Sequence, residues 1–118
     1  MIRAFSSTSL VFLTVAALVL ATQCSPTAPG LGKAESKGQE LFESHCALCH
    51  EFENPGLRKQ PPKLAGLFLS KTLPSGAPAT DDQVRKTIIE GLGTMPAFNQ
   101  RLHRDEVDDI VQYLHTLK

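Results

Sequence analysis

The sequence predicts an all-α domain, and three observations support that fold class. Three segments repeat apolar residues at the spacing of an amphipathic helix. No segment shows the strict alternation of polar and apolar residues that is typical of a strand. Residues 51–79, between the first two helical segments, are proline-rich and show little regular pattern. A stretch this long is unusual in a compact domain, so we expect long loops wrapped around a bound group.

The first helix is predicted over residues 35–49. Leu41, Phe42 and Cys46 fall on one narrow stripe, and polar side chains occupy the rest of the surface. A narrow apolar stripe is typical of a helix that packs against a single neighbour.

The second helix is predicted to begin at Thr80, because Thr80 and Gln83 have the spacing of a capping box. Gly91 and Gly93 are expected to end it. Its apolar face comprises Val84, Ile88 and Ile89.

The third helix is predicted to start near His103 and to run to the end of the chain. The negative charges of Asp105 and Glu106 interact favourably with the positive end of the helix dipole there. Residues at helical spacing form its apolar face: Val107, Ile110, Val111, Leu114 and Leu117.

The N-terminal segment predicts export. Residues 10–21 are almost wholly apolar and lead into a polar stretch, which indicates a signal peptide over residues 1–23 with cleavage near 21–23. About twelve apolar residues are too few to cross a bilayer comfortably as a helix. Residues 24–33 are then expected to be a flexible linker, and residues 34–118 the folded domain.

Two hypotheses for Cys24 remain open. A cysteine between an apolar leader and a Ser/Pro/Thr/Gly-rich tether resembles a bacterial lipoprotein site, which would give the protein a membrane tether. Gln23 and Ala21 depart from that pattern, and cleavage after Ala21 would leave Cys24 as a free thiol. Both hypotheses predict a periplasmic or extracytoplasmic protein, and the first predicts one anchored as a lipoprotein.

The composition argues against nucleic-acid binding and indicates that the domain needs a stabilising group. The chain has 12 basic and 12 acidic side chains, so no basic excess is present to bind nucleic acid. A domain of this size without tryptophan usually needs a disulfide, metal or cofactor to stabilise its small core.

Cys46-Ala47-Leu48-Cys49-His50 has the spacing of c-type haem attachment. Positions i, i+3 and i+4 share one side of a helix, so two thiols and an imidazole are brought together. We expect Cys46 and Cys49 to bind one haem c covalently, with His50 as the proximal iron ligand. A thioredoxin-like dithiol would need a βαβ pattern, and a zinc site would need another ligand cluster. The sequence shows neither.

Met95 is the predicted distal iron ligand, since methionine and histidine are the usual ligands in cytochromes. It is the only methionine besides the initiator and lies in a glycine- and proline-containing segment, 93–98. The alternative is that Met95 only fills the core. The other histidines are expected to lie at the surface or at helix ends: His45, His103 and His115.

Beyond the haem motif, residues 34–118 resemble a class I cytochrome c of the small bacterial type. Gly38 and Phe42 match the family's first helix, and Tyr113-Leu114 match its last. The resemblance implies a cytochrome c fold, with three main helices and long loops around one covalently bound haem. It also implies that these residues form the crossing of the two terminal helices.

Residues 62–66 resemble the family's proline loop. The resemblance implies that the Pro62 carbonyl accepts a hydrogen bond from Nδ1 of His50 and so strengthens that ligand. Pro61 is the adjacent residue, so its carbonyl is an alternative acceptor for the same hydrogen bond.

Residues 91–98 resemble the distal methionine loop of the family and support Met95 as a ligand. His103 departs from the family, which usually has a Ser, Thr or Asp cap there.

These features predict an exported one-electron carrier between redox protein partners, not an enzyme, because His50 and Met95 would leave iron no vacant position. The alternative is a haem c electron-transfer subunit of a larger dehydrogenase or oxidase complex. A peroxidase or gas sensor would require iron without Met95. Three lysines form either a docking rim or an ordinary solvated loop: Lys59, Lys63 and Lys71.

Overall fold

The computed structural model describes residues 32–118, and this part of the chain is helical. The elements in order are α1 (Lys33–His45), α2 (Ala47–His50), the 3₁₀ helix η1 (Leu67–Leu69), α3 (Asp81–Glu90) and α4 (Arg104–Thr116). Residues 32–118 contain no strand, only two isolated bridges. The all-α prediction is therefore confirmed. The expected signal peptide and Cys24 lie outside the described residues.

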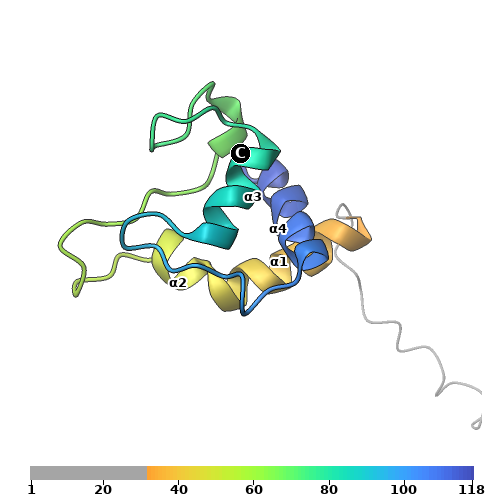
Figure 1. Cartoon of the computed structure of the whole chain (residues 1–118), viewed down its shortest axis with the longest axis horizontal. Coiled ribbons are helices and arrows are strands. Elements are labelled where there is room, and N and C mark those ends of the chain that lie inside the picture. The colour runs from red at the N-terminus through yellow and green to blue at the C-terminus, as the bar shows by residue number, and fades with distance from the viewer. Residues whose placement is uncertain (1–31) are drawn as a thin grey trace, which may run out of the picture.

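The main packing contact is the crossing of α1 and α4, which Figure 1 shows beside α3. Gly38 lies at the point of closest approach. A Cβ atom there would come within 2.0 Å of the Asp109 carbonyl oxygen and 2.8 Å of the Tyr113 Cβ. Only a residue without a side chain allows the two backbones to approach this closely.

Phe42 lies at the centre of the core, one helical turn after Gly38, and is 1% exposed. Its ring packs against Tyr113 with centroids 5.4 Å apart and planes inclined by 55°. Other side chains of α4 are equally buried: Val107, Ile110 and Val111. Burying a side chain of this size contributes about 1.5–3 kcal/mol, so the apolar stripes are what hold α1 on α4.

The predicted single helix over 35–49 is wrong in one respect, because the chain breaks between α1 and α2 at Cys46. Cys46 has φ −117° and ψ −40°, far from helical φ. Hydrogen bonding nonetheless continues through the break: Cys46 N donates to Phe42 O, and His50 N donates to Cys46 O. The helix also begins earlier than predicted, at Lys33.

The second predicted helix matches α3. Thr80 Oγ1 accepts a hydrogen bond from the backbone N–H of Gln83 at 3.3 Å, so Thr80 is the N-cap. Gly91 ends the helix with φ +77°, a conformation that favours glycine.

The third predicted helix matches α4, with His103 at its N-cap. Instead of a hydroxyl cap, the Glu106 carboxylate accepts a hydrogen bond from the His103 backbone N–H at 2.9 Å. The helix ends at Thr116, short of the predicted end of the chain. Leu117 O then accepts a hydrogen bond from Gly66 N at 3.0 Å, which attaches the C-terminus to the start of η1. No helix among residues 32–118 has the length and apolar character needed to cross a membrane.

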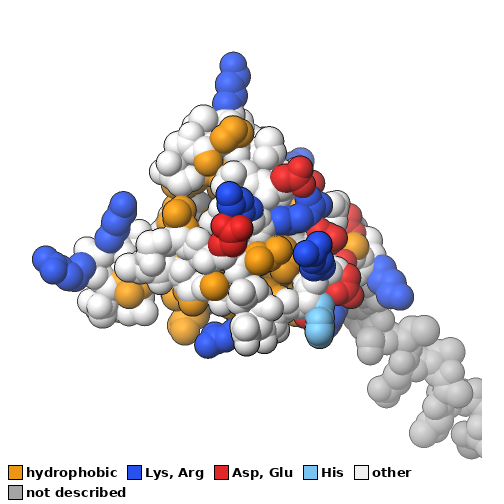
Figure 2. Space-filling model, in the orientation of Figure 1, with side chains coloured by type: hydrophobic (Ala, Val, Ile, Leu, Met, Phe, Trp, Pro, Cys, Tyr) orange, Lys and Arg blue, Asp and Glu red, His pale blue; other side chains and the backbone are white. Residues whose placement is uncertain are grey.

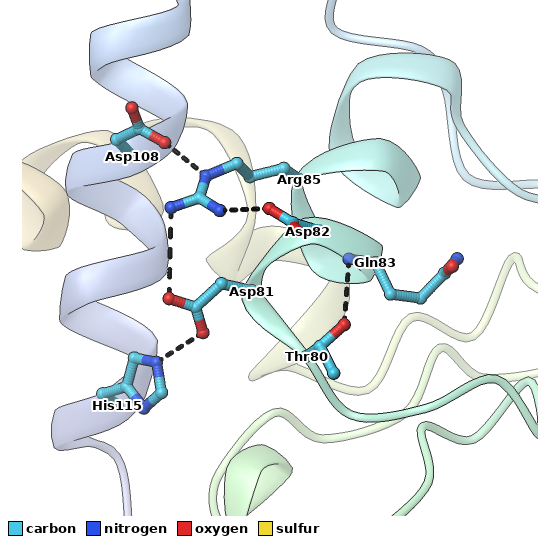
Figure 3. Close-up of polar contacts among 7 residues, drawn as sticks. All are labelled: Thr80, Asp81, Asp82, Gln83, Arg85, Asp108 and His115. Carbon is cyan, nitrogen blue, oxygen red and sulfur yellow. Dashed lines mark hydrogen bonds and ion pairs between the residues drawn. The ribbon is translucent and has the colours of Figure 1, made fainter.

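A polar network joins α3 to α4 on the solvent side (Figure 3). The Arg85 guanidinium lies between Asp82, at 2.9 Å, and Asp108 of α4. His115 Nε2 lies 2.8 Å from Asp81, and its ring stacks on Phe68 of η1 at 3.8 Å. The network therefore fixes η1, α3 and α4 relative to one another at their exposed edges.

Replacing Gly38 with alanine tests the helix crossing. We expect Gly38→Ala to lower the free energy of unfolding by about 3 kcal/mol through overpacking. Alanine favours an isolated helix by about 1 kcal/mol over glycine, so a loss of stability cannot come from helix propensity. Urea denaturation followed by circular dichroism measures the effect.

The neighbouring exposed Lys37→Ala serves as the control for that experiment. It should change the free energy of unfolding by less than about 0.5 kcal/mol. Equal stability of the Gly38→Ala protein and the wild type would contradict the close crossing.

Candidate functional site

The turn from Cys46 to His50 brings the motif residues together. His50 N donates to Cys46 O at 3.0 Å and Cys49 N donates to the same carbonyl at 3.1 Å, so the turn is closed by the backbone. Cys46 is buried, Cys49 is exposed, and neither is paired in a disulfide. Despite the break at Cys46, the two thiols and the imidazole of His50 remain on a single turn.

Burial raises the pKa of the Cys46 thiol to about 11, with a smaller contribution from the charge of Cys49. The thiol is therefore neutral at pH 7, as expected of sulfur facing an apolar environment. A buried neutral thiol suits attachment to an apolar group better than it suits a thiolate metal site.

Among residues 32–118, the side chain of His50 makes one hydrogen bond. Its Nδ1 atom lies 2.7 Å from the carbonyl oxygen of Pro62, and the ring is 9% exposed. A carbonyl only accepts hydrogen bonds, so the proton belongs on Nδ1. Nε2 then carries a free lone pair, which is the form of histidine that binds a metal. The contact is made by Pro62 and not by Pro61.

Met95 is positioned by a tight turn after α3. Leu92 N donates to Met95 O at 3.2 Å, and Met95 N donates to Leu92 O at 3.0 Å. Gly93 lies within this turn with φ +60°. Met95 is half-buried and packs against the hydrophobic core.

Gly91 makes that turn possible. A Cβ atom on Gly91 would lie 2.6 Å from Met95 O and 2.9 Å from Ala97 N. The helix end is thus packed directly on the segment that carries Met95, and the position of the thioether depends on where α3 stops.

The three remaining histidines are exposed and have other contacts. His45 meets Phe98 edge-on at 6.1 Å, His103 precedes α4, and His115 belongs to the network of Figure 3. Only His50 combines burial with an oriented ring.

These residues fit a haem better than a metal ion alone. Within residues 32–118, no three His, Cys, Asp or Glu side chains form a cluster that could hold a metal ion. If His50 and Met95 both bind iron, the remaining iron ligands would have to come from a bound group such as a porphyrin. Large apolar side chains are also exposed beside both segments: Leu48 and Phe52 near the motif, and Leu92 near Met95. Figure 2 shows hydrophobic side chains reaching the surface among charged ones.

Several polar contacts in the loop after His50 were not predicted from the sequence. Gln60 makes hydrogen bonds to the backbone of Asn54, and Lys63 Nζ donates to Glu51 O. Side-chain bonds across a loop leave no periodic pattern, so only the composition of the loop could have drawn attention to them. The three lysines proposed as a docking rim are all exposed.

Comparison with known proteins identifies the family. Residues 33–114 match the family model described as cytochrome C oxidase, cbb3-type, subunit III. The cytochrome bc1 complex cytochrome c subunit of Corynebacterium diphtheriae is 31% identical over 84 residues, which cover 70% of this chain and 27% of that protein. This chain therefore spans about a quarter of the length of that relative.

Shorter relatives match along nearly their whole length. Cytochrome c6 of Picosynechococcus sp. is 27% identical over 106 residues, covering 86% of this chain and 89% of that one. The crystal structure of cytochrome c6 from the diatom Phaeodactylum tricornutum superposes with a TM-score of 0.54 at 25% identity, over 70% of this chain and 91% of that one. The chain belongs to the cbb3-type cytochrome c oxidase subunit III family and is a small class I c-type cytochrome, whose cofactor is covalently attached haem c.

Proposed function

We propose that this protein is an exported one-electron carrier in which Cys46 and Cys49 bind haem c through thioethers, His50 is the proximal iron ligand and Met95 the distal one. The observation that carries the proposal is the hydrogen bond from His50 Nδ1 to Pro62 O, at 2.7 Å. It leaves Nε2 free for iron and fixes the ring on the same turn as both thiols.

The bound haem supplies iron that alternates between the ferric and ferrous states. The protein's own contribution is to keep both ligands in place during that change. Pro62 orients His50 and makes it a stronger donor, while the turn after Gly91 holds Met95. Two protein ligands leave no vacant position for a substrate, so the function is electron transfer and not catalysis. An axial methionine also raises the reduction potential relative to a second histidine.

A second candidate function is a haem c electron-transfer subunit of a larger complex. It is favoured by the matching family, which is an oxidase subunit, and by the Corynebacterium relative, which is a bc1 complex subunit. In both candidates the partners are redox proteins outside the cytoplasm. They differ in whether the contact is transient or permanent, because a permanent interface buries a larger and more apolar surface.

Replacing Met95 tests the distal ligand. We expect Met95→Ala to keep covalent haem but to lose the weak sulfur-to-iron absorption band of the oxidised protein. The vacated position should let the reduced protein bind carbon monoxide rapidly, and the reduction potential should fall. Optical spectra of both oxidation states measure all three changes.

His103→Ala is the matched control for Met95→Ala, since His103 is exposed and precedes α4. It should leave the band and the slow reaction with carbon monoxide unchanged. If the wild type already binds carbon monoxide rapidly at neutral pH, the closed-iron carrier is contradicted and a gas sensor or peroxidase is favoured.

Size-exclusion chromatography of the gently solubilised native extract distinguishes carrier from subunit. The carrier hypothesis predicts that haem-stained protein elutes at the size of the single chain, because a shuttle must leave its partner after each transfer. Elution with a larger dehydrogenase or oxidase at moderate salt would support the subunit hypothesis instead.

The two hypotheses for Cys24 make opposite predictions for the membrane fraction. Lipidation predicts that the intact mass includes acyl chains and that Cys24→Ala releases the protein from membranes. Cleavage after Ala21 predicts a soluble product with an unmodified thiol, for which Cys24→Ala changes only the mass of one side chain. Intact mass spectrometry of both fractions decides between them.

A further inference from the structure

The loop between His50 and Pro62 is held closed mainly by side chains. Among residues 32–118, no backbone-to-backbone hydrogen bond joins residues 51–56 to residues 58–63. Three hydrogen bonds that involve side chains join the two halves of the loop instead. They run from His50 to Pro62 O, from Lys63 Nζ to Glu51 O, and from Gln60 to Asn54 O. The position of the Pro62 carbonyl therefore depends on the other two links.

Gln60 makes the most extensive of these links. Its Oε1 accepts a hydrogen bond from Asn54 N at 3.0 Å, and its Nε2 donates to Asn54 O at 2.7 Å. Nε2 also lies 3.2 Å from Leu57 O. The amide thus pairs with both backbone groups of Asn54, in the way that a residue of a neighbouring strand would.

Asn54 completes the closed end of the loop. Its Oδ1 accepts from Gly56 N at 3.0 Å, and its carbonyl accepts from Leu57 N at 3.0 Å. These are the contacts of an Asx-type turn, which fixes the chain direction locally. Gln60 is anchored on that turn and precedes Pro62 by two residues, with the rigid Pro61 between them.

We propose that Gln60 is a positioning residue for the haem iron: by pairing with Asn54 it holds the Pro62 carbonyl against Nδ1 of His50, and so sets how strongly His50 donates to iron. The inference rests on the proposed role of His50 as the proximal ligand. A hydrogen bond at Nδ1 makes the imidazole a stronger donor, which stabilises ferric iron. Loss of the Gln60 contacts should therefore make the ferrous state more favourable.

The test uses the haem-loaded protein and the substitution Gln60→Met, which keeps the length of the side chain and its neutral charge but removes both kinds of hydrogen bond. We expect the reduction potential to become more positive, with the reduced-to-oxidised ratio at a fixed potential rising up to about tenfold, equivalent to about 59 mV for one electron. In the reduced protein, the Nδ1 proton of His50 should exchange with solvent faster than in the wild type, as measured by nuclear magnetic resonance.

Gln39→Met is the matched control. The side-chain amide of Gln39 donates a hydrogen bond to Glu43 at 2.8 Å, but Gln39 lies on α1 and makes no contact with the loop backbone like those of Gln60. It should leave the potential and the exchange rate unchanged. A folded Gln60→Met protein with Met95 still bound, and with the potential and exchange of the wild type, would overturn the inference.

A measurement on the wild type covers the case in which Gln60→Met does not mature. The side-chain amide protons of Gln60 should be protected from exchange relative to those of Gln100, an exposed residue in the turn before α4. Equal exchange at both amides would overturn the inference. The haem content of the wild type is measured before the variants are compared. If the wild type holds no covalent haem, the proposed function fails and the role of Gln60 is not what has been disproved.

Discussion

The turn from Cys46 to His50 has to present two thiols and one imidazole together, and the rest of the domain is arranged around that requirement. The turn follows α1, whose direction is fixed where Gly38 lies against the backbone of α4. On its other side, His50 is fixed by the carbonyl of Pro62. The geometry of the turn therefore depends on a close helix crossing and on a loop, and neither contact alone would orient the imidazole.

The position of the Met95 segment also depends on one close contact with a helix. α3 ends at Gly91, and the absence of a side chain there lets Met95 and Ala97 pack directly on the helix end. The outer edge of α3 is tied to α4 through Arg85. Exposed ion pairs contribute little stability individually, so the network mainly sets orientation, while the apolar contacts of α1 and α4 supply the stability.

Local signals explain why much of the fold could be predicted from the sequence. The cap at Thr80, the stop at Gly91 and the apolar period of α4 all act within a few residues, so a single sequence carries them. The haem motif is equally local. The 3₁₀ turn η1 and the Gln60 contacts could not be predicted, because they involve hydrogen bonds that leave no periodic pattern in the sequence. The break at Cys46 could not be predicted either, because the apolar stripe of the first helix continues through it. The Glu106 contact that replaces a hydroxyl cap at His103 shows how a second residue can compensate for a missing signal.

Haem attachment through Cys46 and Cys49 is best tested by the intact mass of the chain matured in cells that attach haem c, followed by mass analysis of the peptide that contains residues 46–50. We expect the protein to gain the mass of one haem, the haem to remain on this peptide after denaturation, and Cys46→Ser with Cys49→Ser to abolish the gain. A wild-type protein with the mass of the polypeptide alone, produced beside a control cytochrome that does acquire haem, would contradict it.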